Sequence, residues 1–202
     1  NTIVAKDVFV PVHRFLPYPQ AFGGTYRTEV KGEIVYRVDL VPVTVLILAG
    51  SQIGVARAAL EHVMGKSRTR GITHTNFPTQ VESSGFQMQF AEAAMKIDTA
   101  MLHAQRAADD LDRASEEGRH MDLAERARVR IDTALDAKYC REAVEVLVAA
   151  HGTSSLADAN RLQRLWRDVH TASHHAITEW QVNLEVYGKA LLGVEPNITH
   201  LI

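Results

Sequence analysis

The chain has 202 residues, of which 46% are hydrophobic and 23% charged, and its formal net charge is -2 at pH 7. This composition is typical of a soluble globular protein with one sizeable core, and the balanced charge gives no sign of a nucleic-acid or anionic-membrane surface. A single cysteine, Cys140, excludes an internal disulfide and fits a cytoplasmic location. No charged-then-apolar leader follows Asn1, so we expect no signal peptide. The most apolar stretch, residues 40–50, is about half the roughly 20 residues of a membrane span.

The first 38 residues differ in pattern from the rest. Residues 1–12 alternate and are rich in β-branched side chains, which predicts one strand or an extended arm. A lone strand leaves its backbone groups unpaired, so the arm either pairs with something outside this chain or belongs to a larger protein. Residues 14–37, with their prolines and glycines, are expected to form a surface loop with a short hairpin.

Helical periodicity begins at Asp39 and continues to the end of the chain. We expect four helices, at about residues 39–67, 79–117, 122–150 and 162–192. The expected N-terminal caps are Asp39, Thr79 with Glu82, Asp122 with Glu125, and Ser155, and the expected stops are Gly118 and Gly152. Long antiparallel helices joined by short breaks predict an all-α, up-and-down four-helix bundle with a short N-terminal extended arm.

The last expected helix concentrates the groups that could carry chemistry. His170 and His174 are four residues apart, and His175 has the same spacing to Glu179. No Glu-x-x-His set or cysteine cluster completes a metal site, so we expect no metal. An imidazole can also act as a general base for a phenol or an amine. Simple packing or exposure of these histidines explains the spacing equally well.

Two other segments carry groups that bind phosphate. Arg68 and Arg70 follow the first helix, where a cation is already favoured by the helix dipole and where guanidinium groups could also meet a phosphorylated ligand. Gly152, Thr153 and Ser154 precede the last helix. Such a loop can simply end one helix and cap the next, or its backbone N–H groups can hold a phosphate.

Three stretches resemble the C-terminal part of the acyl-CoA dehydrogenase superfamily. They are KDVFVPVHRFL at residues 6–16, QFAEAAMKIDTAMLHAQ at residues 89–105 and WRDVHTASHH at residues 166–175. The resemblance implies that residues 1–38 are the end of a middle β-domain with its linker. It implies that residues 39–202 are the C-terminal four-helix domain of a larger flavoprotein.

One departure from the dehydrogenase pattern favours a particular branch. In that pattern the pair matching Arg167 and Asp168 leads to a Y-E-G-T stretch, whose glutamate removes the α-proton of the substrate. Counting from Arg167 places that glutamate at Ala176, with the glycine and threonine at Ile177 and Thr178. An alanine cannot remove a proton. The chain is therefore more similar to the two-component flavin-dependent monooxygenases, which have a histidine in this region.

This branch implies a set of cofactors, partners and site residues. Its members take reduced FMN or FAD from a separate flavin reductase and use O2 to hydroxylate an aromatic or amine small molecule. The active-site histidine falls at His175, with His174 as the close alternative. The arginine that contacts the flavin phosphate would be Arg68 or Arg70, although the usual R-x-x-F-G reads R-T-R-G here. The loop Gly152–Ser154 would reach the cofactor of a neighbouring subunit, because the family is usually a homotetramer.

Two other functions stay open. One is an acyl-CoA dehydrogenase whose catalytic base has moved to another helix. The other is a non-catalytic helical oligomerisation module, which the small residues of the first helix would suit. Under the leading hypothesis an isolated fragment would be inactive, because its pockets need the missing domains.

Overall fold

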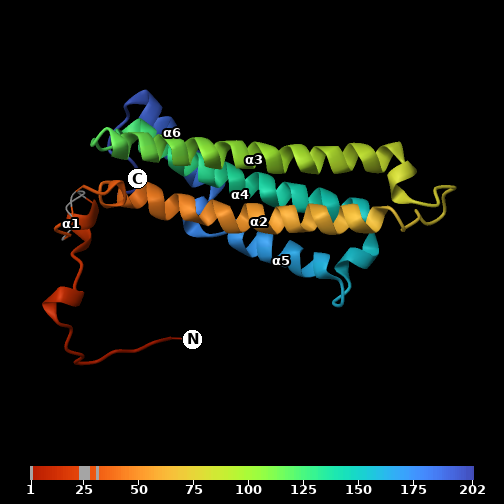
Figure 1. The fold of residues 1–202 in the computed structure, drawn as a ribbon, viewed down its shortest axis with the longest axis horizontal. Helices are drawn as coiled ribbons and strands as arrows, with labels where there is room; N and C mark the ends of the chain where they lie inside the picture. The colour runs from red at the N-terminus through yellow and green to blue at the C-terminus, as the bar shows by residue number, and fades with distance from the viewer. Residues whose placement is uncertain (1, 23–27, 31) are drawn as a thin grey trace.

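The described part of the chain contains helices and no strands, as the predicted all-α class requires. The computed structural model describes residues 2–22, 28–30 and 32–202. Three long helices lie side by side and alternate in direction: α2 (Leu40–Ser67), α3 (Ser84–Glu116) and α4 (Leu123–His151) (Figure 1). The fourth position is filled by α5 (Arg161–Ser173) and α6 (Trp180–Leu192). The up-and-down four-helix bundle is therefore confirmed.

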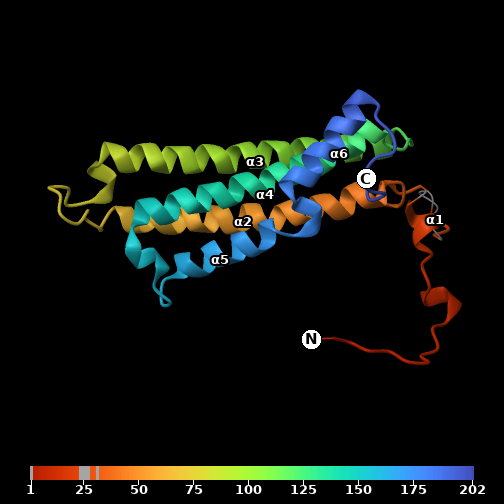
Figure 2. The same cartoon turned by 180° about the vertical axis from the view of Figure 1, so that it is seen from behind.

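The N-terminal segment extends away from the bundle, as Figure 2 shows from behind. Residues 2–11 form no strand, and short helical turns follow at Val12–Arg14, α1 (Tyr18–Phe22) and Ile34–Tyr36. Within this arm Ile3 is 95% and Phe9 is 86% exposed. The extended arm is thus present without a strand. Residues 23–27 and 31, within the loop 14–37 where a short hairpin was expected, lie outside the described residues. The domain boundary at residue 38 stays a prediction.

The core is built around α4, which packs against α2, α3, α5 and α6. For this reason α4 buries most of its circumference between Ala127 and Ala137. On α2 the buried positions instead recur every three or four residues on one face, from Val41 to Ser67, as expected for a helix at the edge of a core. By length and composition α2 is also the one helix among the described residues that could cross a membrane. This is weak support for a span, because core helices meet the same test.

Several expected helix caps form and others do not. Asp122 and Glu125 make the reciprocal capping box at the start of α4, and Gly118 follows α3 with a φ of 68°. The box expected at residues 79 and 82 was wrong. The Thr79 hydroxyl donates to the Glu82 carboxylate at 2.7 Å instead of capping a helix, and Ser83 caps α3 through the Phe86 amide.

Asp39 occupies the N-cap position of α2 as predicted, but its side chain makes no capping hydrogen bond. The cap considered at Ser155 was wrong, because its hydroxyl has another partner. The Asp39 carboxylate accepts a hydrogen bond from the Met121 amide at 2.7 Å, so it connects the start of α2 to the α3–α4 loop. The Ser155 hydroxyl donates to the Gly152 carbonyl at 2.6 Å. Asn160 caps α5 instead.

The single helix predicted over residues 162–192 was wrong as well. It is divided into α5 and α6 by a short 3-10 turn at Ala176–Thr178. Two buried polar side chains satisfy the backbone at this break. The Thr178 hydroxyl donates to the Ser173 carbonyl at 3.3 Å, and the Asn183 amide donates to the Ile177 carbonyl at 2.8 Å. Since these bonds replace those that a helix would lose, the chain can turn here.

Candidate functional site

The predicted site residues fall in two places on the bundle. Arg70 and the loop after α4 meet where α2, α4 and α5 come together, whereas His174 and His175 lie at the other end of α5. A 13-residue helix such as α5 spans about 20 Å. The phosphate-binding candidates and the catalytic candidates are therefore separate sites on this chain.

The first place is a cluster of basic residues, here called the basic cluster. It consists of His62, Lys66, Arg70, His151 and Arg161, which line a pocket of about 610 Å³ with no Asp or Glu among its lining residues. Positive charges without a nearby carboxylate attract an oxyanion. The pocket is therefore suited to a phosphate group.

His151 is the buried member of the basic cluster. It is 3% exposed, and its Nδ1 is buried with no hydrogen-bond partner among the described residues. Burial, followed by the charges of Arg70, His62 and Lys66, lowers the pKa of His151 to about 4. Burial, followed by the charges of Lys66 and Arg161, lowers the pKa of His62. Burial is the main cause of both shifts, and the neighbouring positive charges, whose effect a bound anion would offset, add to it.

Backbone contacts hold Arg70 beside the loop after α4. The Gln80 amide N–H donates to the Arg70 carbonyl at 2.6 Å, and the Gln80 side chain donates to the Ala150 carbonyl at 3.0 Å. Gly152 has a φ of 89°, a conformation that glycine adopts readily. A Cβ there would lie 3.9 Å from Nη2 of Arg70, in ordinary contact, so the backbone conformation and not space favours glycine at this position.

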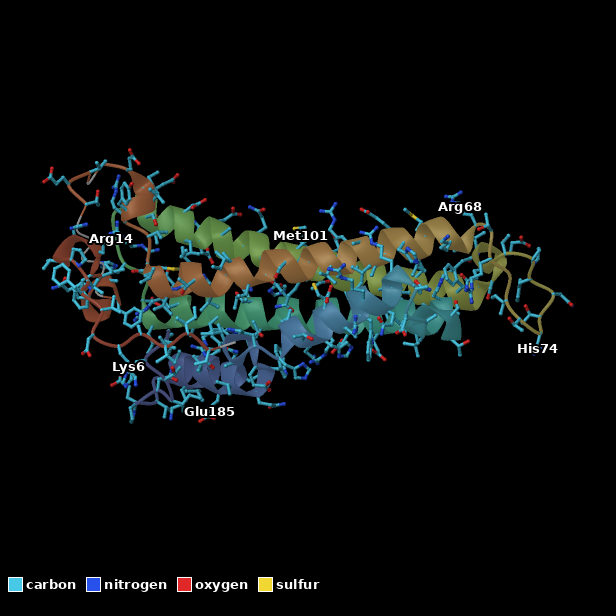
Figure 3. The ribbon with its side chains drawn as sticks, turned by 90° about the horizontal axis from the view of Figure 1, so that it is seen from below. Lys6, Arg14, Arg68, His74, Met101 and Glu185 are labelled. Atoms are coloured by element: carbon cyan, nitrogen blue, oxygen red, sulfur yellow. The ribbon has the colours of Figure 1, made fainter. Side chains whose placement is uncertain are left out.

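The remaining phosphate candidates are distributed around this point. Ser154 lines the pocket of the basic cluster, and Thr153 lines an adjoining pocket of about 420 Å³ together with Arg70 and His151. Arg68 lies at the end of α2 (Figure 3) but lines a different, more apolar pocket with Phe86. The structure therefore gathers Arg70 with the loop and leaves Arg68 apart.

The second place is the α5–α6 junction, where two adjacent histidines are fixed in opposite tautomers. Nδ1 of His174 lies 2.7 Å from the His170 carbonyl oxygen. Since a carbonyl only accepts, this Nδ1 carries the proton, and neutral His174 keeps an acceptor at Nε2. Nδ1 of His175 accepts from the Ile177 amide at 3.2 Å, so neutral His175 carries its proton on Nε2. One imidazole can accept a proton while its neighbour donates a hydrogen bond.

Sequence reasoning missed part of the basic cluster. His62, Lys66 and Arg70 recur at intervals of four residues, which is a readable signal of one basic helix face. Arg161 had no comparable signal, because only the fold brings the start of α5 to α2. Arg164 and Asp168 form a pair at 3.6 Å on the surface. The structure shows no group of three or more metal-binding side chains within its described residues.

Comparisons with known proteins show the family to which this chain belongs. Residues 46–180 match the family model described as acyl-CoA dehydrogenase, C-terminal domain. The chain is 30% identical over 209 residues to the oxygenase component of an FADH2-dependent resorcinol hydroxylase from Rhizobium sp., covering 97% of this chain and 50% of that protein. It is 29% identical over 147 residues to the oxygenase component of p-hydroxyphenylacetate 3-hydroxylase from Acinetobacter baumannii, covering 73% of this chain and 35% of that protein.

A solved structure agrees with the sequence matches. XiaF from Streptomyces sp., solved in complex with FADH2 and glycerol, has a TM-score of 0.89 and 31% identity, covering 97% of this chain and 50% of XiaF. The chain thus spans about half the length of the resorcinol hydroxylase component and of XiaF. The chain belongs to the acyl-CoA dehydrogenase C-terminal domain family.

Proposed function

We propose that this chain is the C-terminal half of the oxygenase component of a two-component monooxygenase, which uses reduced flavin and O2 to hydroxylate an aromatic small molecule. The observation that carries this proposal is the likeness to XiaF, which binds FADH2 and shares the fold over 97% of this chain. The relatives described as oxygenase components of aromatic hydroxylases support it. Such a component receives its flavin from a separate reductase, which is the partner we propose.

The basic cluster fits the phosphate end of a flavin. Lys66, Arg70 and Arg161 supply fixed positive charge in a pocket without carboxylates, and the unpartnered Nδ1 of His151 is available to a polar group. Charge-assisted hydrogen bonds from guanidinium groups to phosphate are among the strongest that side chains form. Because XiaF holds FADH2, we propose FADH2 rather than reduced FMN as the ligand.

At the α5–α6 junction the two histidines have different roles, one as proton acceptor and the other as hydrogen-bond donor. Nε2 of His174 accepts the proton of a substrate hydroxyl, which raises the electron density of the aromatic ring that is to be hydroxylated. Nε2 of His175 donates a hydrogen bond to the oxygen that is transferred or released. Reduced flavin, when bound, supplies the two electrons that activate O2.

Two neighbouring arginines allow a sharp test of the basic cluster. In the full-length protein, Arg70→Gln is expected to raise the Kd for FADH2 by about tenfold or more, because a hydrogen bond to a charged group contributes about 1.5–3 kcal/mol. Arg68→Gln is the matched control and is expected to leave this Kd within about twofold, since Arg68 lines another pocket. Anaerobic titration of FADH2 followed by its fluorescence measures both. Equal loss in both variants would exclude the basic cluster as the phosphate site.

The reaction itself is tested with the full-length protein, a flavin reductase, NADH and 18O2. We expect one 18O atom in the hydroxylated phenol, detected by mass spectrometry. An acyl-CoA dehydrogenase would instead reduce its bound flavin with an acyl-CoA under anaerobic conditions and would incorporate no 18O. Anaerobic reduction by an acyl-CoA without 18O incorporation would reject the monooxygenase function in favour of the dehydrogenase function.

We also propose that the assembled enzyme is a homotetramer in which the groove between α2 and α3 contacts another subunit. Positions that would receive a neighbour are open, because a Cβ at Gly50 or Gly54 would meet nothing within 4 Å. Met101 lines the same groove of about 340 Å³ (Figure 3). Close approach of helix backbones at small residues would suit such a contact.

A further inference from the structure

A small pocket lies between α4 and the α5–α6 junction, outside the basic cluster. Its volume is about 210 Å³, and its walls include Lys138 and Arg141 from α4, His174 at the end of α5, and Trp180 at the start of α6. Complete ligand pockets measure about 300–1,000 Å³. This pocket is therefore large enough for the polar end of a ligand and too small for a flavin.

Arg141 differs from the other cations of α4. The structure gives acceptors to four of them: Arg126 donates to the Ile202 carbonyl, Arg128 to Asp110, Arg130 to Asn183, and Lys138 faces Glu142. Arg141 is half-buried and has no hydrogen bond or ion pair with any described residue. A guanidinium has five N–H donors and no acceptor, so a half-buried one without a protein partner has donors available for an anion.

Lys138 adds charge and Trp180 adds an aromatic wall. Nζ of Lys138 lies 4.8 Å from the centre of the Trp180 ring and 3.6 Å from the Glu142 carboxylate. Glu142 binds Lys96 more closely, at 2.8 Å, so it neutralises Lys138 only in part. Glu179 is the acidic residue in the lining, and the two cations exceed its charge.

His174 connects this pocket to the candidate chemistry. It lines the pocket, and its Nδ1 is held by the His170 carbonyl, which leaves Nε2 as the acceptor. A ligand whose anionic group meets Arg141 therefore shares its pocket with a candidate proton acceptor.

We propose that this pocket is an oxyanion subsite, in which Arg141 binds the carboxylate of an aromatic substrate. The proposal rests on the proposed function for the identity of its ligand. A flavin phosphate is the other source of an oxyanion, and the basic cluster about one α5 length away is the better match for it.

The test compares two phenols of similar shape in the full-length protein: 4-hydroxyphenylacetate and the neutral 4-ethylphenol. Arg141→Gln is expected to lower kcat/KM for the carboxylate by about 10- to 100-fold, the range of a hydrogen bond to a charged group. It is expected to change kcat/KM for 4-ethylphenol and the Kd for FADH2 by less than about twofold. Arg164→Gln is the control, because Arg164 is exposed and, among the described residues, forms an ion pair only with Asp168.

Three results would overturn the subsite: equal losses for both phenols, a weaker FADH2 affinity in Arg141→Gln, or equal affinities of the unmodified protein for both phenols. Calorimetric binding of the two phenols without turnover separates this proposal from the proposed function. Arg141-dependent binding of the carboxylate without hydroxylation would leave the subsite standing and reject the monooxygenase. Hydroxylation without any dependence on Arg141 would reject the subsite and leave the monooxygenase standing.

Discussion

His175→Ala in the full-length protein is expected to lower kcat for hydroxylation by about 100-fold, the lower range for a positioned acid or base. The reason is the Nε2–H of His175, which the bond from the Ile177 amide to Nδ1 fixes in place. Loss of that bond also removes the cap of the 3-10 turn, which contributes about 1 kcal/mol. The measurement is the rate of product formation under saturating FADH2 and O2, together with the thermal midpoint of unfolding.

His175→Asn separates the chemistry from the cap. The asparagine carbonyl can still accept from the Ile177 amide, but the side chain lacks the imidazole Nε2–H. If the hydrogen bond from Nε2 matters, the Asn variant is as slow as the Ala variant although its thermal midpoint recovers. Recovery of kcat with Asn would show that only the cap is needed. Unchanged turnover in both variants would reject His175 as a catalytic residue.

Asp136→Asn is expected to stabilise the protein increasingly as the pH rises from 5 to 8. Asp136 is fully buried, and neither carboxylate oxygen has a hydrogen-bond partner among the described residues. Burial, and then the charge of Asp132, raises the pKa of Asp136 to about 8, while Arg106 acts in the opposite direction. The folded protein therefore keeps a proton that the unfolded chain releases.

The sign of the effect follows from this proton. Between the ordinary value of 3.8 and about 8, stability falls as the pH rises, by about 1.4 kcal/mol per unit. It is constant above that range. An asparagine has a similar shape and never ionises, so the variant should gain roughly 3–6 kcal/mol at pH 8 and much less at pH 5.

Thermal unfolding of the full-length protein at pH 5 and pH 8, followed by circular dichroism, measures the difference. Asp112→Asn serves as the control, because Asp112 is exposed on α3 and its loss should have the same small effect at both values. A gain for Asp136→Asn that does not change with pH would mean that the buried carboxyl does not take up a proton on folding.

The buried Asp136 also shows where reading the sequence fails. The helical pattern places Leu135 on the apolar face of α4, yet the structure leaves Leu135 half-buried and buries Asp136 completely. A one-sided apolar stripe is expected only when one face meets a core. Because α4 packs against helices on several sides, its sequence carries no clear stripe to follow.

The candidate site was predicted as residue types and only partly as an arrangement. Arg70 and the loop after α4 were predicted as phosphate ligands, and they do meet in the structure. Arg68 was predicted in the same way, but it lies apart from both. The two arginines are two residues apart, and the turn after α2 directs them to different pockets. The tautomers of His174 and His175 had no sequence signal, because they depend on backbone atoms at a break that the pattern did not predict.

By itself the sequence determined the helical class, the approximate positions of the three long helices α2, α3 and α4, the capping box at Asp122 and the family resemblance. These properties depend on periodicity, local caps and short motifs, which act within a few residues of each other. Only the tertiary structure decided the break between α5 and α6, the assembly of the basic cluster and the unpartnered state of Arg141. Those features depend on which backbone and side-chain groups from distant segments form hydrogen bonds or ion pairs with one another. The spacing of residues along the chain does not reveal these contacts.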